Sequence, residues 1–411
     1  MLSEAMASSP SLKGRSSAET RSAIVDVIRS EGEISRTELA RRSLLTEATI
    51  SKIVKSLLED GIIVESGFAK STGGKRPVLL RLNDQTLYAV GITLDVTRCV
   101  IVLCGLDGAE VDRCEIEGTG QGEPPLVIDR VARALQRLLK GRGTRPESIV
   151  GVGVASGGRG YSPGRKLDAA SLDSWDSYPI EEELAARTGF AVIRENDANC
   201  AALGEYWTTG GSATRDFITL YLAYGIGCGL IIAGAIYRGV SGNAGEIGHT
   251  LAVTNGPLCW CGRRGCLDTV ASPRAVTEQI VANPALRAAC DVTRDTEFGE
   301  TYRRFGQLVK DGNEPAQRLF RATADHLSGA VNDLVNTLDL DLVSLAGPGF
   351  ADLGEEYRSA IDEQLSTFAL TRGVRPITVR LGTGGADAAA RGAASVVLHR
   401  ELTPHRSVAA P

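Results

Sequence analysis

Residues 88–118 read YAVGITLDVTRCVIVLCGLDGAEVDRCEIEG, three apolar, β-branched runs with glycine turns at 105–108. Runs of this kind predict three consecutive strands. A helix is expected over 125–143, because Val127, Val131, Leu135 and Leu138 share one face. A buried strand is expected next, at 147–156. The predicted order is strand, strand, strand, helix, strand.

The same order recurs later in the chain. Residues 216–239 (DFITLYLAYGIGCGLIIAGAIYRG) again predict three strands. A helix is expected around 314–337, followed by a strand in 341–349, another helix and a strand at 377–382. An internal repeat of this kind predicts an α/β fold of two related lobes with a cleft between them. Glycine-rich turns at strand ends in such folds commonly face a ligand.

Length and composition limit the class of protein. The chain has 411 residues, of which 43% are apolar and 23% charged, so two or three ordinary globular domains are expected at ~150 residues each. No run of ~18 apolar residues predicts a membrane span. The first 20 residues are polar and lack the apolar core of a signal peptide. We therefore expect a cytoplasmic protein, in which nine scattered cysteines are free thiols or metal ligands.

The N-terminal segment predicts a winged helix-turn-helix domain. Residues 21–31 form one amphipathic helix, the capping box S-R-T-E at 35–38 begins a second, and 46–60 form a third that Gly61 ends. Residues 62–82 then read as two strands around a basic, glycine-rich tip. Three helices followed by a hairpin are typical of a DNA-binding module.

The third helix leaves a polar face open, which suits the major groove, and the basic tip suits backbone phosphates or the minor groove. Residues 11–85 hold 13 Lys/Arg against 10 Asp/Glu, a net +3, whereas the whole chain carries −5. The alternative is a three-helix module that binds a protein. The residues expected to contact double-stranded DNA are Thr46, Thr49, Ser51, Lys52, Lys55, Lys75 and Arg76.

Residues 245–268 (GEIGHTLAVTNGPLCWCGRRGCLD) predict a metal site. His249, Cys259, Cys261 and Cys266 have the spacing H-x9-C-x-C-x4-C. Three thiolates and one imidazole satisfy a closed, tetrahedral, structural zinc site. Four protein ligands leave no open position, which disfavours a catalytic zinc. The alternatives are free cysteines in a loop, or a redox role for Cys259 or Cys261.

Three motifs together resemble the ROK family of repressors, open reading frames and kinases: ENDANCAALGE at 195–205, GEIGH at 245–249 and CWCGRRGCLD at 259–268. STGGKRPVLLRLN at 71–83 is similar to the regulator branch. The resemblance covers residues 20–395. It implies an actin-like, ribonuclease-H-like duplicated two-lobe ATPase fold, a sugar in the cleft, and a homodimer or homotetramer.

The expected domain organisation follows from these segments. A disordered tail (1–19) precedes the winged helix-turn-helix domain (20–82), a linker (83–87) and the ROK-like effector domain (88–400), whose cleft is expected near 195–270. Residues 401–411 form a second tail.

The resemblance also implies a sugar site. Asp197 stands at the position of the kinase general base, which takes a proton from a sugar hydroxyl. From the residues alone, Asp197 could instead cap a helix and Glu246 could only brace the zinc loop. The preceding segment departs from the family pattern at Gly157, Gly158 and Ser171. The sugar-binding residues that the resemblance implies are Asn196, Asp197, Glu246, His249 and Asp268.

The first phosphate loop of the kinase members is degraded here. The family pattern D-x-G-G-T aligns with residues 93–97, where Thr93 replaces the acidic residue and Asp95 and Val96 replace the glycines. A carboxylate at Asp95 would repel nucleotide phosphates. Two other glycine loops persist, at 224–229 (YGIGCG) and 346–350 (AGPGF). We expect ATP binding to be impaired or lost, and the protein not to be an enzyme.

Three functional hypotheses remain. The first is a sugar-responsive transcriptional regulator, a repressor that binds a two-fold symmetric operator. The second is a sugar kinase with an accessory DNA-binding domain. The third is a regulator that has lost its sugar and responds to a protein partner.

Overall fold

The computed structural model describes residues 17–69, 76–84, 86–120, 122–157, 175, 177–209 and 216–402. Both predicted tails fall largely outside these ranges, as do Lys75, Gly158 and Ser171. The first helix begins at Ser17 and the last ends at Leu402.

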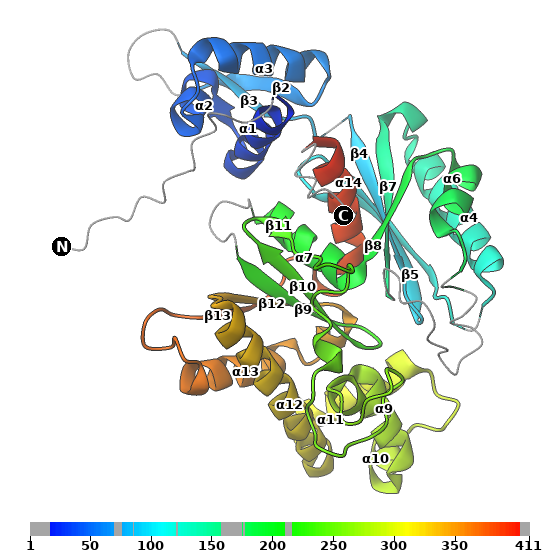
Figure 1. The fold of residues 1–411 in the computed structure, drawn as a ribbon. Helices are drawn as coiled ribbons and strands as arrows, with labels where there is room; N and C mark the ends of the chain where they lie inside the picture. Colours follow the sequence, from blue (N-terminus) through cyan, green and yellow to red (C-terminus); the bar gives the residue numbers. More distant parts are fainter. Residues whose placement is uncertain are drawn as a thin grey trace.

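The N-terminal domain is a winged helix (Figure 1). Ser35 and Thr46 cap its second and third helices, since their hydroxyls accept the backbone N–H of Glu38 and Thr49 at 3.2 Å. Leu44, in the turn where no glycine is available, takes a left-handed φ of 57°. The strands order as β1-β3-β2. The elements are α1 (Ser17–Glu31), β1 (Ile34–Ser35), α2 (Arg36–Ser43), α3 (Glu47–Glu59), β2 (Ile63–Phe68) and β3 (Val78–Leu82).

The first lobe is built on a five-stranded sheet of order β6-β5-β4-β7-β8. Strands β4, β5 and β6 are antiparallel, as consecutive strands with short turns require, while β7 and β8 extend the sheet in parallel with β4. The elements are β4 (Tyr88–Leu94), β5 (Arg98–Gly105), β6 (Glu110–Glu117), α4 (Pro124–Arg142), η1 (Pro146–Ser148), β7 (Ile149–Ser156), α6 (Ile180–Thr188) and β8 (Val192–Asn196).

The second lobe repeats this topology, with strand order β11-β10-β9-β12-β13 and the same pattern of antiparallel and parallel pairs. The predicted duplication is therefore confirmed. The elements are β9 (Phe217–Leu222), β10 (Ile226–Ile232), β11 (Ala235–Ile236), α12 (Glu314–Leu338), β12 (Leu342–Ala346), η3 (Pro348–Phe350), α13 (Gly354–Phe368) and β13 (Thr378–Leu381).

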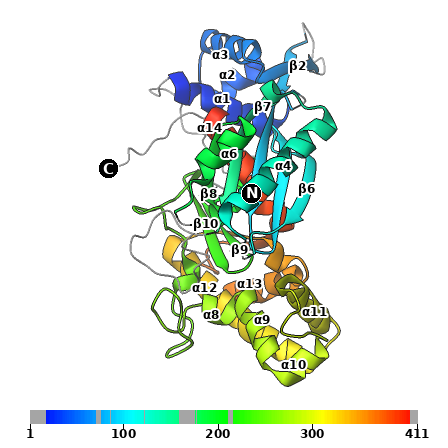
Figure 2. The same ribbon diagram turned by 90° about the vertical axis from the view of Figure 1, so that its right-hand side faces the viewer.

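One part of the second lobe breaks the simple repeat. Between β11 and α12 the chain forms the cysteine loop and a helical layer that the strand pattern did not predict. Figure 2 shows this layer at the end of the molecule opposite the winged helix. Its elements are η2 (Ile247–His249), α8 (Asp268–Ala271), α9 (Pro273–Ala282), α10 (Pro284–Ala289) and α11 (Phe298–Lys310).

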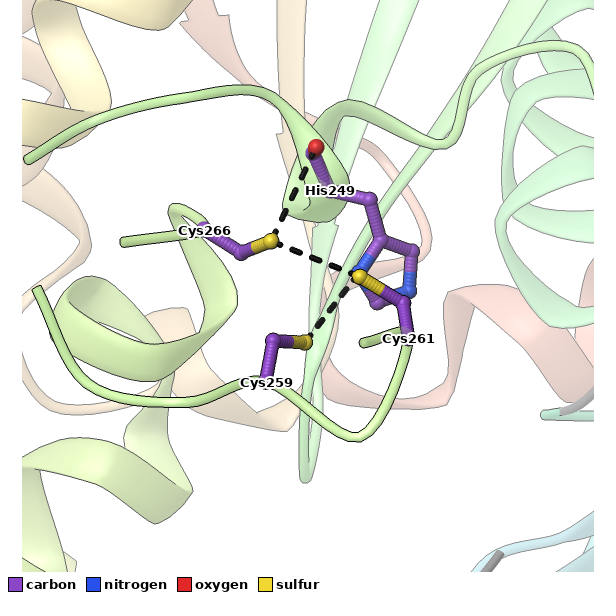
Figure 3. Close-up of side chains that lie close together, drawn as sticks. All are labelled: His249, Cys259, Cys261 and Cys266. Atoms are coloured by element: carbon purple, nitrogen blue, oxygen red, sulfur yellow. Dashed lines mark hydrogen bonds between the residues drawn. The ribbon is translucent and has the colours of Figure 1, made fainter. Parts of the chain in front are cut away.

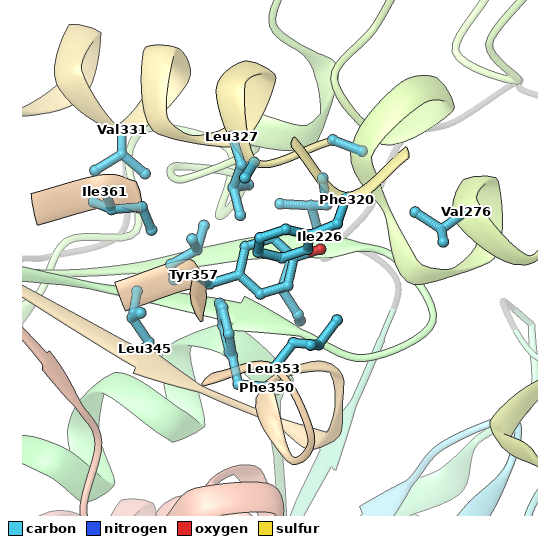
Figure 4. Packing of buried hydrophobic residues seen from close by; sticks show 14 of the residues in the cluster. Ile226, Val276, Phe320, Leu327, Val331, Leu345, Phe350, Leu353, Tyr357 and Ile361 are labelled. Carbon is cyan, nitrogen blue, oxygen red and sulfur yellow. The ribbon is translucent and has the colours of Figure 1, made fainter. Parts of the chain in front are cut away.

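The core of the second lobe lies between its sheet and these helices. Tyr357 of α13 is fully buried at its centre and meets the rings of Phe320 and Phe350 edge-on (Figure 4). Its hydroxyl lies 3.3 Å from that of Tyr302, so the buried polar group has a partner. This packing fixes the helical layer that carries the cysteine loop.

Two helices lie between the lobes, α7 (Asp197–Thr208) and α14 (Ala388–Leu402), the latter preceded by η4 (Gly385–Asp387) (Figure 1). α14 packs so closely on the first sheet that a Cβ at Gly91 or Gly153 would lie 1.8 or 2.0 Å from a helix carbonyl oxygen. Glycine is therefore required at these two strand positions.

Among the described residues, none of the helices combines the length and apolar character needed to cross a membrane.

We predict that Gly91→Ala lowers the free energy of unfolding by about 1–3 kcal/mol, because the added methyl group meets backbone atoms that cannot rotate away. Chemical denaturation measures the loss. The control is Gly141→Ala in α4, where a Cβ meets nothing within 4 Å and stability should hold or rise. Equal losses in both variants would contradict the close packing of α14.

Candidate functional site

The four predicted metal ligands come together in the second lobe (Figure 3). Their ligand atoms all lie within 4.8 Å of one another. His249 ends η2, and the three cysteines follow in a loop that two left-handed glycines, Gly262 and Gly265, allow to turn tightly. The sequence spacing therefore reflects a real cluster.

The geometry of this cluster fits zinc. The Sγ atoms of Cys261 and Cys266 are 3.6 Å apart, and Sγ of Cys259 lies 3.5 Å from Nδ1 of His249. Tetrahedral Zn–S bonds of ~2.3 Å place two sulfur ligands about 3.8 Å apart. Burial raises the pKa of the Cys266 thiol to about 12, so a metal ion that binds here must displace its proton. The four residues therefore fit the predicted tetrahedral zinc site.

His249 faces two sites at once. Its Nδ1 points at Cys259, whereas its Nε2 lies 3.8 Å from an oxygen of Glu246. The ring of Trp260 stands perpendicular to the imidazole at 4.6 Å. A single imidazole can thus serve the sulfur cluster with one nitrogen and orient the Glu246 carboxylate with the other.

Asn196 and Asp197 sit where strand β8 becomes helix α7. Asn196 is the N-cap, and its side-chain oxygen accepts the N–H of Asn199 at 3.1 Å. Asp197 accepts the N–H of Ala198 at 2.8 Å through Oδ1, while a Cβ at Gly157 would lie 3.4 Å from Oδ2. The capping role is therefore filled by Asn196, and the second oxygen of Asp197 remains beside the end of β7.

Burial raises the pKa of Asp197 from 3.8 to about 6, and the negative charges of Asp95 and Glu246 add to the effect. The charges identify the groups that share this site. Asp95 follows β4 and Asp197 begins α7, both in or beside the first lobe, whereas Glu246 belongs to the second. Charged residues of both lobes therefore act electrostatically on Asp197.

Asp268 is placed differently from the other expected sugar ligands. It is buried, its Oδ1 accepts the N–H of Ile226 at 3.2 Å, and its Oδ2 pairs with Arg274 at 3.1 Å. A Cβ at Gly225 would come within 3.0 Å of the same carboxylate. Asp268 thus supports the glycine loop at 224–229, and its contact with a sugar stays a prediction.

In the degraded phosphate loop, the side chain of Asp95 accepts hydrogen bonds from the loop itself. Oδ1 of Asp95 accepts both the N–H and the hydroxyl of Thr97, at 2.8 and 2.6 Å. Thr93 is buried, with its hydroxyl directed at the carbonyl of Val100. An acceptor carboxylate therefore holds a backbone N–H that a phosphate oxygen would otherwise need.

Packing explains why the loop at 346–350 contains glycines. Gly347 has a φ of 105°, and a Cβ there would lie 2.3 Å from the carbonyl oxygen of Leu222. A Cβ at Gly349 would lie 2.6 Å from Leu222 Cβ. Packing against β9 demands both glycines, so their presence does not argue for a bound nucleotide.

Sequence reasoning missed one ion pair that joins the lobes at this site. Arg238 follows β11 and donates Nε and Nη2 to one oxygen of Glu195, at 2.9 and 2.6 Å. The other Glu195 oxygen accepts the Asn196 N–H and the Asn199 side-chain amide, at 3.0 and 3.1 Å. Glu195 was visible within ENDAN, but Arg238 had no sequence signal.

The expected DNA-contacting residues all lie exposed where they are described. The free face of α3 presents four of them beside the N-cap Thr46, and Arg76 is exposed just before β3. Lys55 lies 3.8 Å from Glu59. The exposed residues of this face are Thr46, Thr49, Ser51, Lys52 and Lys55.

Fold and site together define the class: a winged helix domain in front of a two-lobe, sugar-kinase-like α/β body. Residues 89–400 match the model of the ROK family, and residues 18–64 match a winged helix-turn-helix DNA-binding model. The chain belongs to the ROK family.

Relatives of two kinds share this sequence. The chain is 30% identical over 337 residues to a xylose repressor of Caldicellulosiruptor bescii, covering 81% of this chain and 84% of the relative. It is 29% identical over 328 residues to a glucokinase of Halalkalibacterium halodurans, covering 76% of this chain and 96% of the relative.

Solved structures show the same fold. A ROK family transcriptional regulator, a homologue of the E. coli MLC protein, superimposes with a TM-score of 0.70 at 20% identity, covering 94% of this chain and 98% of the other. A ROK family glucokinase from Streptomyces griseus in complex with glucose and AMPPNP gives a TM-score of 0.62 at 26% identity, covering 75% and 98%. The regulator matches through the winged helix, whereas the kinase matches three quarters of the chain.

We predict that Cys261→Ser lowers bound zinc, because a hydroxyl replaces one of three thiolates in a closed tetrahedral set. Metal analysis of the purified protein should find about one zinc per wild-type chain and a clear loss in the variant. Cys114→Ser, a half-buried cysteine outside the cluster, should keep its zinc. Full zinc content in Cys261→Ser would show that the ligand set is wrong.

We predict that Asp197→Asn raises stability at pH 8 by about 1–3 kcal/mol. The pKa of Asp197 is higher in the folded protein, about 6, than its ordinary 3.8. The folded state therefore binds the proton more tightly, and this contribution to stability is lost as pH rises from about 4 through 6. An amide carries no charge, so the gain should fade by pH 4.

Thermal unfolding across this pH range tests the prediction. Asp295→Asn changes an exposed carboxylate and should have little effect at any pH. A gain in Asp197→Asn that does not depend on pH would contradict the assigned burial of the charge.

Proposed function

We propose that the protein is a transcriptional repressor of sugar-metabolism genes, which binds operator DNA and is released by a sugar held between the lobes. The observation that carries the proposal is one contrast within the site. Within the phosphate loop, Asp95 accepts the backbone N–H and the hydroxyl of Thr97, whereas the expected sugar ligands Asp197 and Glu246 interact electrostatically. A body that keeps a sugar site without a phosphate site suits sensing better than phosphoryl transfer.

The N-terminal domain supports the DNA-binding half of the proposal. Its third helix exposes hydroxyl and lysine side chains on one face, which match base edges and phosphates in a major groove. We propose a homodimer, or a homotetramer built from such dimers, because two recognition helices are needed to read a two-fold symmetric operator.

The sugar chemistry is proposed from the relatives. Among curated relatives, xylose repressors share about 30% identity with this chain, which makes D-xylose the first sugar to test. The residues proposed to bind it are Asn196, Asp197, Glu246 and His249, with Asp268 as a further candidate. Zinc would be structural, holding the loop that carries His249 against Glu246.

Because glucokinases are also among the relatives, we consider a second function, that of an ATP-dependent sugar kinase. A thermal-shift screen against D-xylose, D-glucose, their phosphates and ATP with magnesium separates the two. Stabilisation by a sugar but not by ATP supports the repressor. Stabilisation by ATP, with turnover of a hexose in a coupled assay, would establish the kinase instead. A flat sugar screen beside selective DNA binding would favour a regulator that responds to a protein partner.

We predict that Lys52→Ala weakens binding to a DNA fragment selected by the wild-type protein by about tenfold, with a shallower salt dependence, because a phosphate contact is lost. Fluorescence anisotropy at several salt concentrations measures both effects. Lys310→Ala, in α11 of the distant helical layer, should bind like wild type. Unchanged affinity and salt slope in Lys52→Ala would contradict the assignment of α3 as the recognition helix.

A further inference from the structure

Trp207, in the last turn of α7, is the point where three other parts of the chain meet. It is 1% exposed, and its indole N–H donates to the carbonyl of Leu106 in the β5–β6 turn at 3.3 Å. His399 of α14 meets the ring edge-on at 6.1 Å. The guanidinium of Arg29, from the first helix of the winged helix domain, lies 4.4 Å from the ring centroid.

Arg29 is buried in this contact, with 3% of its side chain exposed. It donates to the backbone carbonyl of Trp207 and pairs with Asp26 of its own helix at 3.4 Å. Tyr206 provides a second ring 5.9 Å away. A cation that stacks on an aromatic ring and satisfies a carbonyl at a helix C-terminus is favoured by the ring quadrupole and by the helix dipole. The winged helix is thus fastened to the end of α7.

The other end of α7 is the proposed sugar site. Asn196 caps the helix and Asp197 is its first residue, and their side chains accept the N–H groups of Asn199 and Ala198. A helix of 12 residues spans about 18 Å at ~1.5 Å per residue. One straight element therefore has proposed effector ligands at its first turn and the DNA-binding domain at its last.

α7 cannot absorb a displacement by local repacking. A Cβ at Gly392 of α14 would lie 1.8 Å from the carbonyl oxygen of Cys200, and one at Gly204 would lie 2.9 Å from Gly392 Cα. Near the last turn, buried Glu205 accepts the N–H and hydroxyl of Thr383 at 2.8 and 2.9 Å. Helices in backbone contact are expected to move together, because close-packed interiors have low compressibility and transmit strain.

The winged helix shares a core with the body at the same place. One apolar cluster joins Ile24, Ile28 and Leu39 of the winged helix to Trp207, Leu398 and Leu402. The DNA-binding domain is therefore held by packing as well as by the linker.

We propose that α7 couples the two sites, with the Arg29–Trp207 contact as the joint through which a sugar at the first turn changes how the winged helix is held. The inference rests on the proposed function for its ligands. The coupling itself is a property of α7 in the ligand-free protein, which allows a test that uses neither sugar nor DNA.

The first experiment compares hydrogen exchange in wild type and Arg29→Met. The variant keeps the length of the side chain and loses the cation. The control is Arg21→Met, because Arg21 lies on the same helix but bonds to Ser56 and Asp60 within the winged helix domain. We expect Arg29→Met to speed exchange severalfold at 205–209 and also at Ala198 and Asn199, whose N–H groups bond to the proposed sugar ligands. Faster exchange at 205–209 alone, or the same pattern in Arg21→Met, overturns the proposal.

The second experiment measures binding to the selected DNA fragment with and without D-xylose. Wild type should lose at least about fivefold in affinity when the sugar is added. The affinity of Arg29→Met for D-xylose should lie within about twofold of that of wild type. Its affinity for the DNA fragment should be nearly the same with and without the sugar. If D-xylose weakens DNA binding by Arg29→Met as much as by wild type, the proposed coupling is wrong. If wild type binds neither DNA nor any sugar of the panel, the proposed function is wrong, and the hydrogen-exchange result alone tests whether Arg29 and Trp207 connect the two ends of α7.

Arg29→Lys covers the case in which Arg29→Met does not fold. Lysine keeps the charge but not the planar stacking group. Exchange should therefore become faster at both ends of α7 together, by a smaller factor than complete loss of the Arg29–Trp207 contact would give. A change at one end only counts against the proposal.

Discussion

Direct backbone contact between elements from distant parts of the chain is the constraint on which this structure depends. α14 lies against β4 and β7 at Gly91 and Gly153, and against α7 at Gly392. A side chain at any of these positions would occupy the space of a carbonyl oxygen. Because the helices touch through backbone, the first sheet and the helix pair form one rigid unit, on which the winged helix and the second lobe are mounted.

The site is organised by charge. Burial raises the pKa of Asp197, and the negative charges of Asp95 in the first lobe and Glu246 in the second raise it further. Such a site favours hydroxyl donors over phosphates, since like charges repel strongly where water is scarce. Asp95 adds a second reason, because its carboxylate already accepts hydrogen bonds from the N–H and the hydroxyl of Thr97. Both effects act against the binding of nucleotide phosphates, which is consistent with the proposed neutral sugar.

The cysteine cluster and the proposed sugar site are connected through one residue. His249 directs one ring nitrogen to Cys259 and the other to Glu246. The Arg238–Glu195 pair ties the loop before Glu246 to the strand before Asp197. Loss of order in the cysteine loop is therefore expected to change the position of the Glu246 carboxylate.

The sequence by itself determined the parts whose cause is local. The repeated strand order, the capping residues Ser35 and Thr46 and the ligand spacing His249–Cys266 depend on neighbours along the chain, and each predicted element is present in the structure. The resemblance of ENDAN and GEIGH to a family then suggested which polar residues share a site. Neither source could predict the helical layer α8–α11, whose position follows from packing against the second sheet.

Tertiary structure alone decided which distant residues meet. Asp268, expected at the sugar, is held by Ile226 and Arg274, because α8 directs it toward the glycine loop. Arg238 and Arg29 carry no sequence motif, yet one joins the lobes and the other fastens the winged helix to Trp207. Arg29 acquires its role only from the chain that folds around it, since the charge of its buried side chain must be matched. That match is a property of three-dimensional packing and is invisible in the order of residues.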